Sequence, residues 1–230
     1  MKVLVGCPTS DHKEYCLDPY INSIKSLTYK NDILLVDNSE NKDYYKKIKE
    51  KGIPVIKDKY RETARDRIVH SRNILRRQVL DNGYDYLLSL EQDVIPPKNI
   101  IERLLAHKKD VISGVYYKKI YITVKNKEYT KIVPLLWKIT KEDKEKKLIT
   151  YITDEELQTS LLNIDMCGLG CLLIHRNVLE KIKFRYKKQE KAFDDTWFCK
   201  DAIKNNFKIY ANPTLKCKHL IEGMNWNIKQ

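Results

Sequence analysis

Two carboxylates follow a run of apolar residues in the segment YDYLLSLEQDVIPP, which spans residues 84–97. Glu91 and Asp93 stand on either side of Gln92, and a pair of prolines ends the segment. Two acids this close repel each other unless a cation or a basic group lies between them. Mg²⁺ and Mn²⁺ prefer carboxylate oxygens, often together with the oxygens of a phosphate. The segment therefore predicts a divalent cation site; the alternative is a solvated acid pair balanced by a lysine.

Three further polar clusters have comparable positions. PTSD (8–11) and DNS (37–39) each follow a β-rich apolar run, and Asp194-Asp195 begins a segment with helical periodicity. If the apolar runs are strands of one parallel sheet, their carboxyl ends lie at the same edge, where open α/β sheets bind ligands. Each cluster alone is also typical of a turn or a helix start. Together they predict one site at that edge.

Arginines are concentrated in the segment ETARDRIVHSRNILRR, residues 62–77. Arg65, Arg72 and Arg76 lie near one another on a predicted helix, and Arg72 interrupts its apolar period. A guanidinium group matches the oxygens of a diphosphate. The alternative is that these arginines simply cover the helix surface.

The elements that position these residues change in character along the chain. Strand and helix patterns alternate up to residue 90, which predicts a mostly parallel sheet with helices on both faces. Residues 110–139 are β-branched and aromatic and predict antiparallel strands or a hairpin, whereas residues 141–160 are charged and loop-like. After a strand, a glycine turn and a second strand, we expect a helix capped by Asn177. The helix that begins at Asp194 should bury Phe198 and Ile203.

The composition limits the classes of partner. The 230 residues carry a formal net charge of +13, which suits nucleic acid, an anionic membrane face or a phosphorylated substrate. Much of the charge lies in runs of mixed sign that are typical of a soluble surface. The first apolar run is shorter than that of a signal peptide, and no window has the length of a membrane span. We therefore expect a cytoplasmic protein, at most peripheral to a membrane, with six reduced, buried cysteines.

The order of these parts resembles the GT-A-fold glycosyltransferases, particularly family-2-like members. The resemblance covers roughly residues 2–220, and its most specific pieces are LSLEQDVIPP and GCLLIHRNVLEKI. Glu91 stands where the family more commonly has aspartate. The resemblance implies an α/β fold in one domain, residues 1–230, with a mostly parallel, Rossmann-like sheet and a smaller antiparallel portion. Residues 1–108 would bind a nucleotide sugar, and residues 109–230 would face the acceptor.

The resemblance also implies a role for each cluster. Asp93 and His219 would hold Mn²⁺ or Mg²⁺. Asp195, with Asp194 beside it, would be the catalytic base. The donor-binding residues would be Pro8 and Thr9 beside the nucleoside, Asp37 at the base or ribose, Arg72 at the base or diphosphate, and Glu91 and Gln92 next to the cation.

The expected reaction follows from this set. When a sugar–phosphate bond breaks, negative charge develops on the diphosphate, and a cation and an arginine neutralise it. A carboxylate takes the proton of the acceptor hydroxyl. Because the chain shows a base but no obvious nucleophile, we expect inversion. The acceptor would be a glycan, a lipid-linked molecule or a protein, and no nucleic acid would be bound.

Two other functions compete with this one. A basic nucleic-acid-binding protein would explain the charge, but no binding motif of that class occurs. A nucleotidyltransferase that makes sugar nucleotides usually carries a glycine-rich basic loop after its first strand, which GCPTSDHKE lacks.

Overall fold

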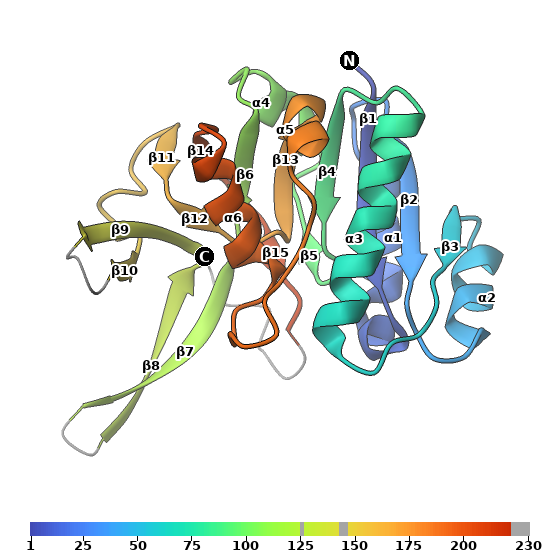
Figure 1. The fold of residues 1–230 in the computed structure, drawn as a ribbon, viewed down its shortest axis with the longest axis horizontal. Helices are drawn as coiled ribbons and strands as arrows, with labels where there is room; N and C mark the ends of the chain where they lie inside the picture. Colours follow the sequence, from blue (N-terminus) through green and yellow to red (C-terminus); the bar gives the residue numbers. More distant parts are fainter. Residues whose placement is uncertain (125–126, 143–146, 222–230) are drawn as a thin grey trace.

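The computed structural model describes residues 1–124, 127–142 and 147–221. In these residues a central eight-stranded sheet has the order β11-β14-β6-β13-β4-β1-β2-β3 (Figure 1). Its strands are β1 (Val3–Thr9), β2 (Asp32–Asp37), β3 (Val55–Lys57), β4 (Tyr86–Leu90), β6 (Val111–Val115), β11 (Leu162–Ile164), β13 (Cys171–His175) and β14 (Ile209–Lys216). β1 pairs in parallel with β2 and β4, whereas β13 is antiparallel to β4 and β6. The expected α/β fold with a mostly parallel sheet is confirmed.

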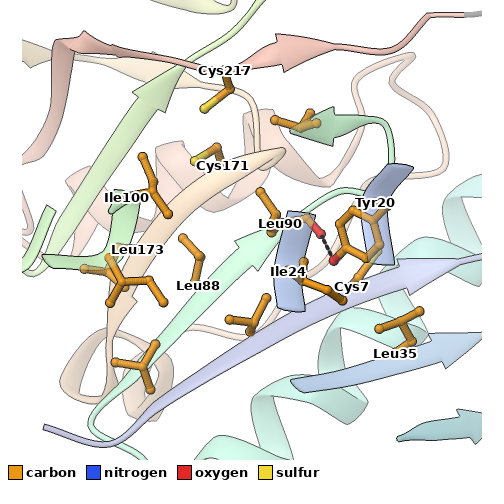
Figure 2. Close-up of a cluster of buried hydrophobic side chains, with 14 of the residues drawn as sticks. Cys7, Tyr20, Ile24, Leu35, Leu88, Leu90, Ile100, Cys171, Leu173 and Cys217 are labelled. Carbon is orange, nitrogen blue, oxygen red and sulfur yellow. Dashed lines mark hydrogen bonds between the residues drawn. The ribbon is translucent and has the colours of Figure 1, made fainter. Parts of the chain in front are cut away.

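Helices cover both faces of this sheet (Figure 1). They are α1 (Leu17–Lys25), α2 (Asp43–Glu50), α3 (Ala64–Asp81), α4 (Ile100–Leu105), α5 (Arg176–Lys181) and α6 (Asp194–Lys204), together with the 3₁₀ helix η1 (Asp11–Cys16). Side chains alternate along a strand, so Val3 and Val5 join the core beneath α1, α2 and α4, while Leu4 joins the core beneath α3, α5 and α6. The first core contains the fully buried Tyr20, whose hydroxyl donates a hydrogen bond to the Leu90 carbonyl oxygen over 3.0 Å (Figure 2). This bond ties α1 to the end of β4, just before the two carboxylates.

Smaller antiparallel sheets make up the rest of the described chain. They are β9 (Leu136–Glu142) with β10 (Lys147–Tyr151) and β12 (Met166–Cys167), β5 (Val94–Ile95) with β15 (Lys218–His219), and β7 (Tyr117–Val124) with β8 (Lys127–Pro134). The β7–β8 pair is the expected hairpin, and it extends away from the central sheet (Figure 1). The expectation of a loop over residues 141–160 is wrong in part, because β10 pairs with β9 there. The run LITYI (148–152) is rich in β-branched and aromatic residues, but the charged run before it obscures this short signal. Residues 143–146 of the expected loop lie outside the described ranges.

Two expectations about helices are also wrong. Asn177 does not cap α5: His175 is the N-cap, and its Nδ1 accepts a hydrogen bond from the Asn177 backbone N–H over 3.2 Å. In α6, Phe198 is buried as expected, but Ile203 is 43% exposed. No helix among the described residues has both the length and the apolar character needed to cross a membrane.

Candidate active site

The predicted clusters after β1, β2 and β4 meet at the carboxyl edge of the sheet. Thr9 and Asp37 lie opposite each other in the β1–β2 register, and the Asn38 backbone N–H donates to the Thr9 carbonyl oxygen over 2.9 Å. A cavity of about 240 Å³ opens at this edge. Six residues expected to bind the donor or the cation line it, namely Pro8, Thr9, Arg72, Glu91, Gln92 and Asp93.

A short antiparallel pairing between β5 and β15 brings His219 to Asp93. The imidazole Nε2 lies 3.5 Å from Asp93 Oδ2, and Nδ1 lies 2.7 Å from the Tyr117 carbonyl oxygen. Because a carbonyl only accepts hydrogen bonds, Nδ1 carries a hydrogen. Burial lowers the pKa of His219, but Asp93 raises it above the usual value, so in the free protein Nε2 of the protonated ring faces Asp93 as a donor, and loss of that proton would leave its lone pair for a cation. The two residues predicted to bind a cation therefore lie side by side.

Lys13, which lies in η1, also contacts this carboxylate. Its Nζ forms an ion pair with Asp93 Oδ2, the same oxygen that faces His219. Burial alone raises the pKa of Asp93, but the hydrogen bond from His219 and the charge of Lys13 outweigh it and hold that pKa below its usual value. Burial lowers the pKa of Lys13, but the Asp93 carboxylate raises it to about 12. The Asp93 side chain is thus an anion with a lysine as counter-ion.

Gln92, between the two acids, connects three elements. Its Oε1 accepts hydrogen bonds from the Thr9 hydroxyl and, over 2.9 Å, from the Tyr44 hydroxyl. Its Nε2 donates to the Lys13 carbonyl oxygen over 2.6 Å. The amide is buried and its bonds end on β1, α2 and η1, so it holds the cavity wall in place.

Arg72 of α3 contacts both acidic clusters. Its Nη2 lies 2.5 Å from Glu91 Oε1, and its Nη1 donates to the Ser89 hydroxyl over 2.6 Å. Its Nε lies 2.7 Å from Asp194 Oδ2 as an ion pair whose angles are not those of a hydrogen bond. The guanidinium is buried, with a side chain only 3% exposed. Arg72 therefore links the end of β4 to the start of α6.

The acids at the start of α6 have different surroundings. Asp194 is buried against Arg72, whereas Asp195 Oδ1 accepts a hydrogen bond from the Thr196 backbone N–H over 2.6 Å. Burial raises the pKa of both carboxyls, and for Asp194 the charge of Arg72 partly opposes it. Both carboxyls are thus easier to protonate than an ordinary aspartate, and Asp194 is the one held in an ion pair by an arginine.

Asp37 is the last residue of β2 and does not line the cavity. Its Oδ1 accepts hydrogen bonds from the Ser39 backbone N–H and hydroxyl, over 3.0 and 2.5 Å, and its Oδ2 lies 3.2 Å from Lys57 Nζ. The neighbouring Asn38 lines the cavity in its place. The expected contact of Asp37 with the base or ribose stays a prediction.

Several polar residues at this edge were not expected from the sequence. They are His12, Lys13 and Arg67, which line the cavity beside Asn38 of the predicted DNS cluster. Lys13 belongs to the charged run SDHKE, which gives no sign that its partner is a residue eighty positions further on. A visible signal existed for Arg67, because it shares the arginine-rich helix with Arg72.

A second polar group lies beyond the cavity, where β3 ends. Asp58 is buried; its Oδ2 lies 2.8 Å from His70 Nδ1 and 3.2 Å from the Ser71 hydroxyl, while Arg61 approaches Oδ1 to 3.2 Å. Burial opposes ionisation of Asp58, but the bonds from His70 and Arg61 keep its pKa below the usual value. Since Asn38 donates to the Ser71 hydroxyl over 3.2 Å, this group supports the wall of the cavity.

The donor atoms at Asp93 fit a hard divalent cation whose coordination a substrate completes. Asp93 Oδ1 is buried and has no hydrogen-bond partner among the described residues, and His219 offers Nε2. No group of three or more His, Cys, Asp or Glu side chains suited to a metal ion occurs in the described part of the chain. Mg²⁺ commonly takes only one or two protein ligands and adds water and phosphate oxygens. Two protein donors beside a cavity are therefore enough for a cation that binds together with a phosphate.

Solved glycosyltransferases have the same arrangement of elements. The structure of GalNAc-T7 with UDP, GalNAc and Mn²⁺ gives a TM-score of 0.67 at 13% identity and covers 98% of this chain and 45% of that one. The structure of S. aureus TarS 1-349 with UDP-GlcNAc gives a TM-score of 0.61 at 13% identity, over 100% of this chain and 62% of that one. The chain has a GT-A fold.

The other comparisons add little to this assignment. A197 from STIV matches with a TM-score of 0.51 at 18% identity, over 96% of this chain and 87% of that one. No protein-family model matches the sequence, and no curated protein matches it. The likeness thus establishes the GT-A fold. This chain spans about half the length of the GalNAc-T7 chain and about three fifths of the TarS chain.

Proposed function

We propose that this GT-A protein is a glycosyltransferase of the family-2-like kind, which moves a sugar from a nucleoside diphosphate to an acceptor hydroxyl with inversion. The observation that carries the proposal is the meeting of two pairs, Asp93 with His219 and Arg72 with Asp194, at the carboxyl edge of the sheet. Arg72 and Asp93 both line the cavity there. The GalNAc-T7 and TarS structures hold UDP or a UDP-sugar, which makes UDP the first nucleotide to test.

The donor would lie along the ends of β1, β2 and β4. Pro8 and Thr9 would contact the nucleoside, and Asp37 the base or ribose. Asp93 and His219 would hold Mn²⁺ or Mg²⁺. When bound, this cation would neutralise negative charge that develops on the leaving diphosphate. Arg72, which carries a positive charge in the cavity wall, would add to that effect and keep the two acidic clusters at a fixed separation.

Asp195 is the better candidate for the base. Arg72 already holds Oδ2 of the Asp194 carboxylate in an ion pair. Burial raises the pKa of both acids and so brings them closer to neutral pH, where a general base is most effective, and Asp195 is the one outside that ion pair. In this proposal Asp195 takes the proton of the acceptor hydroxyl, and Asp194 orients Arg72.

The chain would divide this work between two halves of one domain. Residues 1–108 would bind the donor, and residues 109–230, which include the β7–β8 hairpin, would meet a glycan, lipid-linked or protein acceptor. The surplus of basic residues suits a peripheral contact with anionic lipid. Co-sedimentation with anionic vesicles at low salt tests this contact, and absence of binding there would contradict it.

A panel of nucleotide sugars tests the proposed reaction. The protein is incubated with each donor and Mn²⁺, and released nucleoside diphosphate is measured with and without a chelator. We expect release from one donor class, and its loss on chelation. Release of pyrophosphate from a nucleoside triphosphate and a sugar phosphate, with no diphosphate release from any donor, would instead identify a nucleotidyltransferase.

A further inference from the structure

Lys13 has a backbone held by hydrogen bonds and a side chain that is partly exposed. Its carbonyl oxygen accepts from Gln92 Nε2 over 2.6 Å, and its backbone N–H donates to the Ser10 carbonyl oxygen over 2.8 Å. The side chain itself is 40% exposed and lines the cavity. The ammonium group on its flexible four-carbon stem can therefore leave Asp93 without a change in the main chain.

The ammonium group occupies the position that a cation would need. Lys13 Nζ and His219 Nε2 both face Asp93 Oδ2, while the buried Oδ1 has no hydrogen-bond partner within the described ranges. A divalent ion binds a carboxylate oxygen at roughly 2.0–2.2 Å. With Lys13 still on the same oxygen, three positive charges would lie within a few ångströms, and the Asp93 side chain, 7% exposed, is poorly screened by solvent.

The charge count links this competition to the diphosphate. Asp93 supplies one negative charge, which balances Lys13 alone but not Lys13 together with a divalent ion. Glu91 and Asp194 share the single positive charge of Arg72, so that group adds at most one negative charge, and the three positive charges still exceed the two negative ones. A diphosphate brings the missing negative charge, and lysine is a common ligand of phosphate oxygens. The cation and the diphosphate should therefore bind more tightly together than apart.

We propose that Lys13 is a displaceable counter-ion of the cation site: it neutralises Asp93 in the free protein, leaves Oδ2 when a divalent cation binds, and then contacts the donor diphosphate. The second half of this proposal rests on the proposed function. The competition between lysine and cation does not, because it concerns the cation alone.

Binding of Mn²⁺ without nucleotide tests the competition. Free Mn²⁺ is measured by electron paramagnetic resonance during titration of the parent protein, Lys13→Gln and a matched control, Lys47→Gln. Lys47 pairs with Glu14 at the surface and does not line the cavity, so its variant makes the same charge change away from the site. We expect Kd for Mn²⁺ to fall at least tenfold in Lys13→Gln and to change less than twofold in Lys47→Gln. Lys13→Arg, which keeps the charge, should bind Mn²⁺ no more tightly than the parent.

Adding UDP tests the diphosphate step. UDP should tighten Mn²⁺ binding more in the parent than in Lys13→Gln, so the tenfold difference shrinks or reverses. An unchanged Mn²⁺ affinity in Lys13→Gln, with its thermal melting intact, overturns the proposal; if that variant does not fold, Lys13→Ala is held to the same criterion. Tighter Mn²⁺ binding by Lys13→Gln with no effect of UDP on any protein supports the competition and overturns the diphosphate step together with the proposed function.

Discussion

The Nε atom of Arg72 lies 2.7 Å from Oδ2 of Asp194, so one buried guanidinium holds the first turn of α6. The same group contacts Glu91 at the end of β4. Two acidic clusters that lie a hundred residues apart in sequence are thus joined through α3. The neighbouring acids have different partners: Asp194 lies against this guanidinium, and Asp195 accepts a hydrogen bond from the Thr196 backbone N–H.

Replacement of Asp195 tests its role as the base. Asp195→Asn should lower the rate of sugar transfer by roughly 10²–10⁴-fold, the usual range for a general base. Affinities for nucleotide and Mn²⁺ should change little, since Asp195 does not line the donor cavity. Asp194→Asn is the matched comparison and should lose less activity. Near-parental transfer by Asp195→Asn would show that another group is the base, and loss of donor binding would move Asp195 to the nucleotide site.

The pH dependence of the reaction provides a second test of Asp195. Burial raises the pKa of this carboxyl, and only its ionised form can accept a proton. The rate should therefore fall as pH is lowered through a value above the usual aspartate pKa of about 4. A profile of kcat against pH measures this acidic limb, which should disappear in Asp195→Asn. A limb that persists unchanged in this variant would assign the titration to a different group.

Arg72→Met should destabilise the protein. It removes a buried cation and leaves the Asp194 carboxylate, 5% exposed, without its partner. Removing one partner of a buried ion pair commonly lowers the free energy of unfolding by about 3 kcal/mol. Urea denaturation measures the loss, and Arg77→Met on the exposed face of α3 is the control, expected to cost less than about 0.5 kcal/mol. Equal stability of the two variants would mean that the Arg72 contacts contribute little to the fold.

The edge of the sheet could be predicted because its signals are local. An apolar run followed by polar residues marks a strand end, and alternation with helices indicates parallel strands. The polar clusters that contain Thr9, Asp37 and Asp93 could therefore be expected to meet at one edge from topology alone. His219 was different. It reaches Asp93 through the two-residue strand β15, which is too short to leave a pattern in the sequence, and only the family resemblance pointed to it.

Contacts between distant side chains could not be predicted. Lys13 pairs with Asp93 and Gln92 bonds to Tyr44, yet both contacts depend on the relative positions of η1, α2 and β4. The strand β10 did have a local signal, the β-rich run LITYI of residues 148–152, which was missed because the segment 141–160 is charged overall. The relative positions of η1, α2 and β4, in contrast, are not contained in the local hydrophobic pattern.

The central claim is that Asp93 holds a divalent cation that binds together with a nucleoside diphosphate. The most direct measurement is calorimetric titration of UDP into the parent protein and into Asp93→Asn, each with and without Mn²⁺, with thermal melting as the check on folding. We expect Mn²⁺ to tighten UDP binding to the parent and to have no effect on UDP binding to Asp93→Asn. The same enhancement by Mn²⁺ in both proteins would contradict the claim.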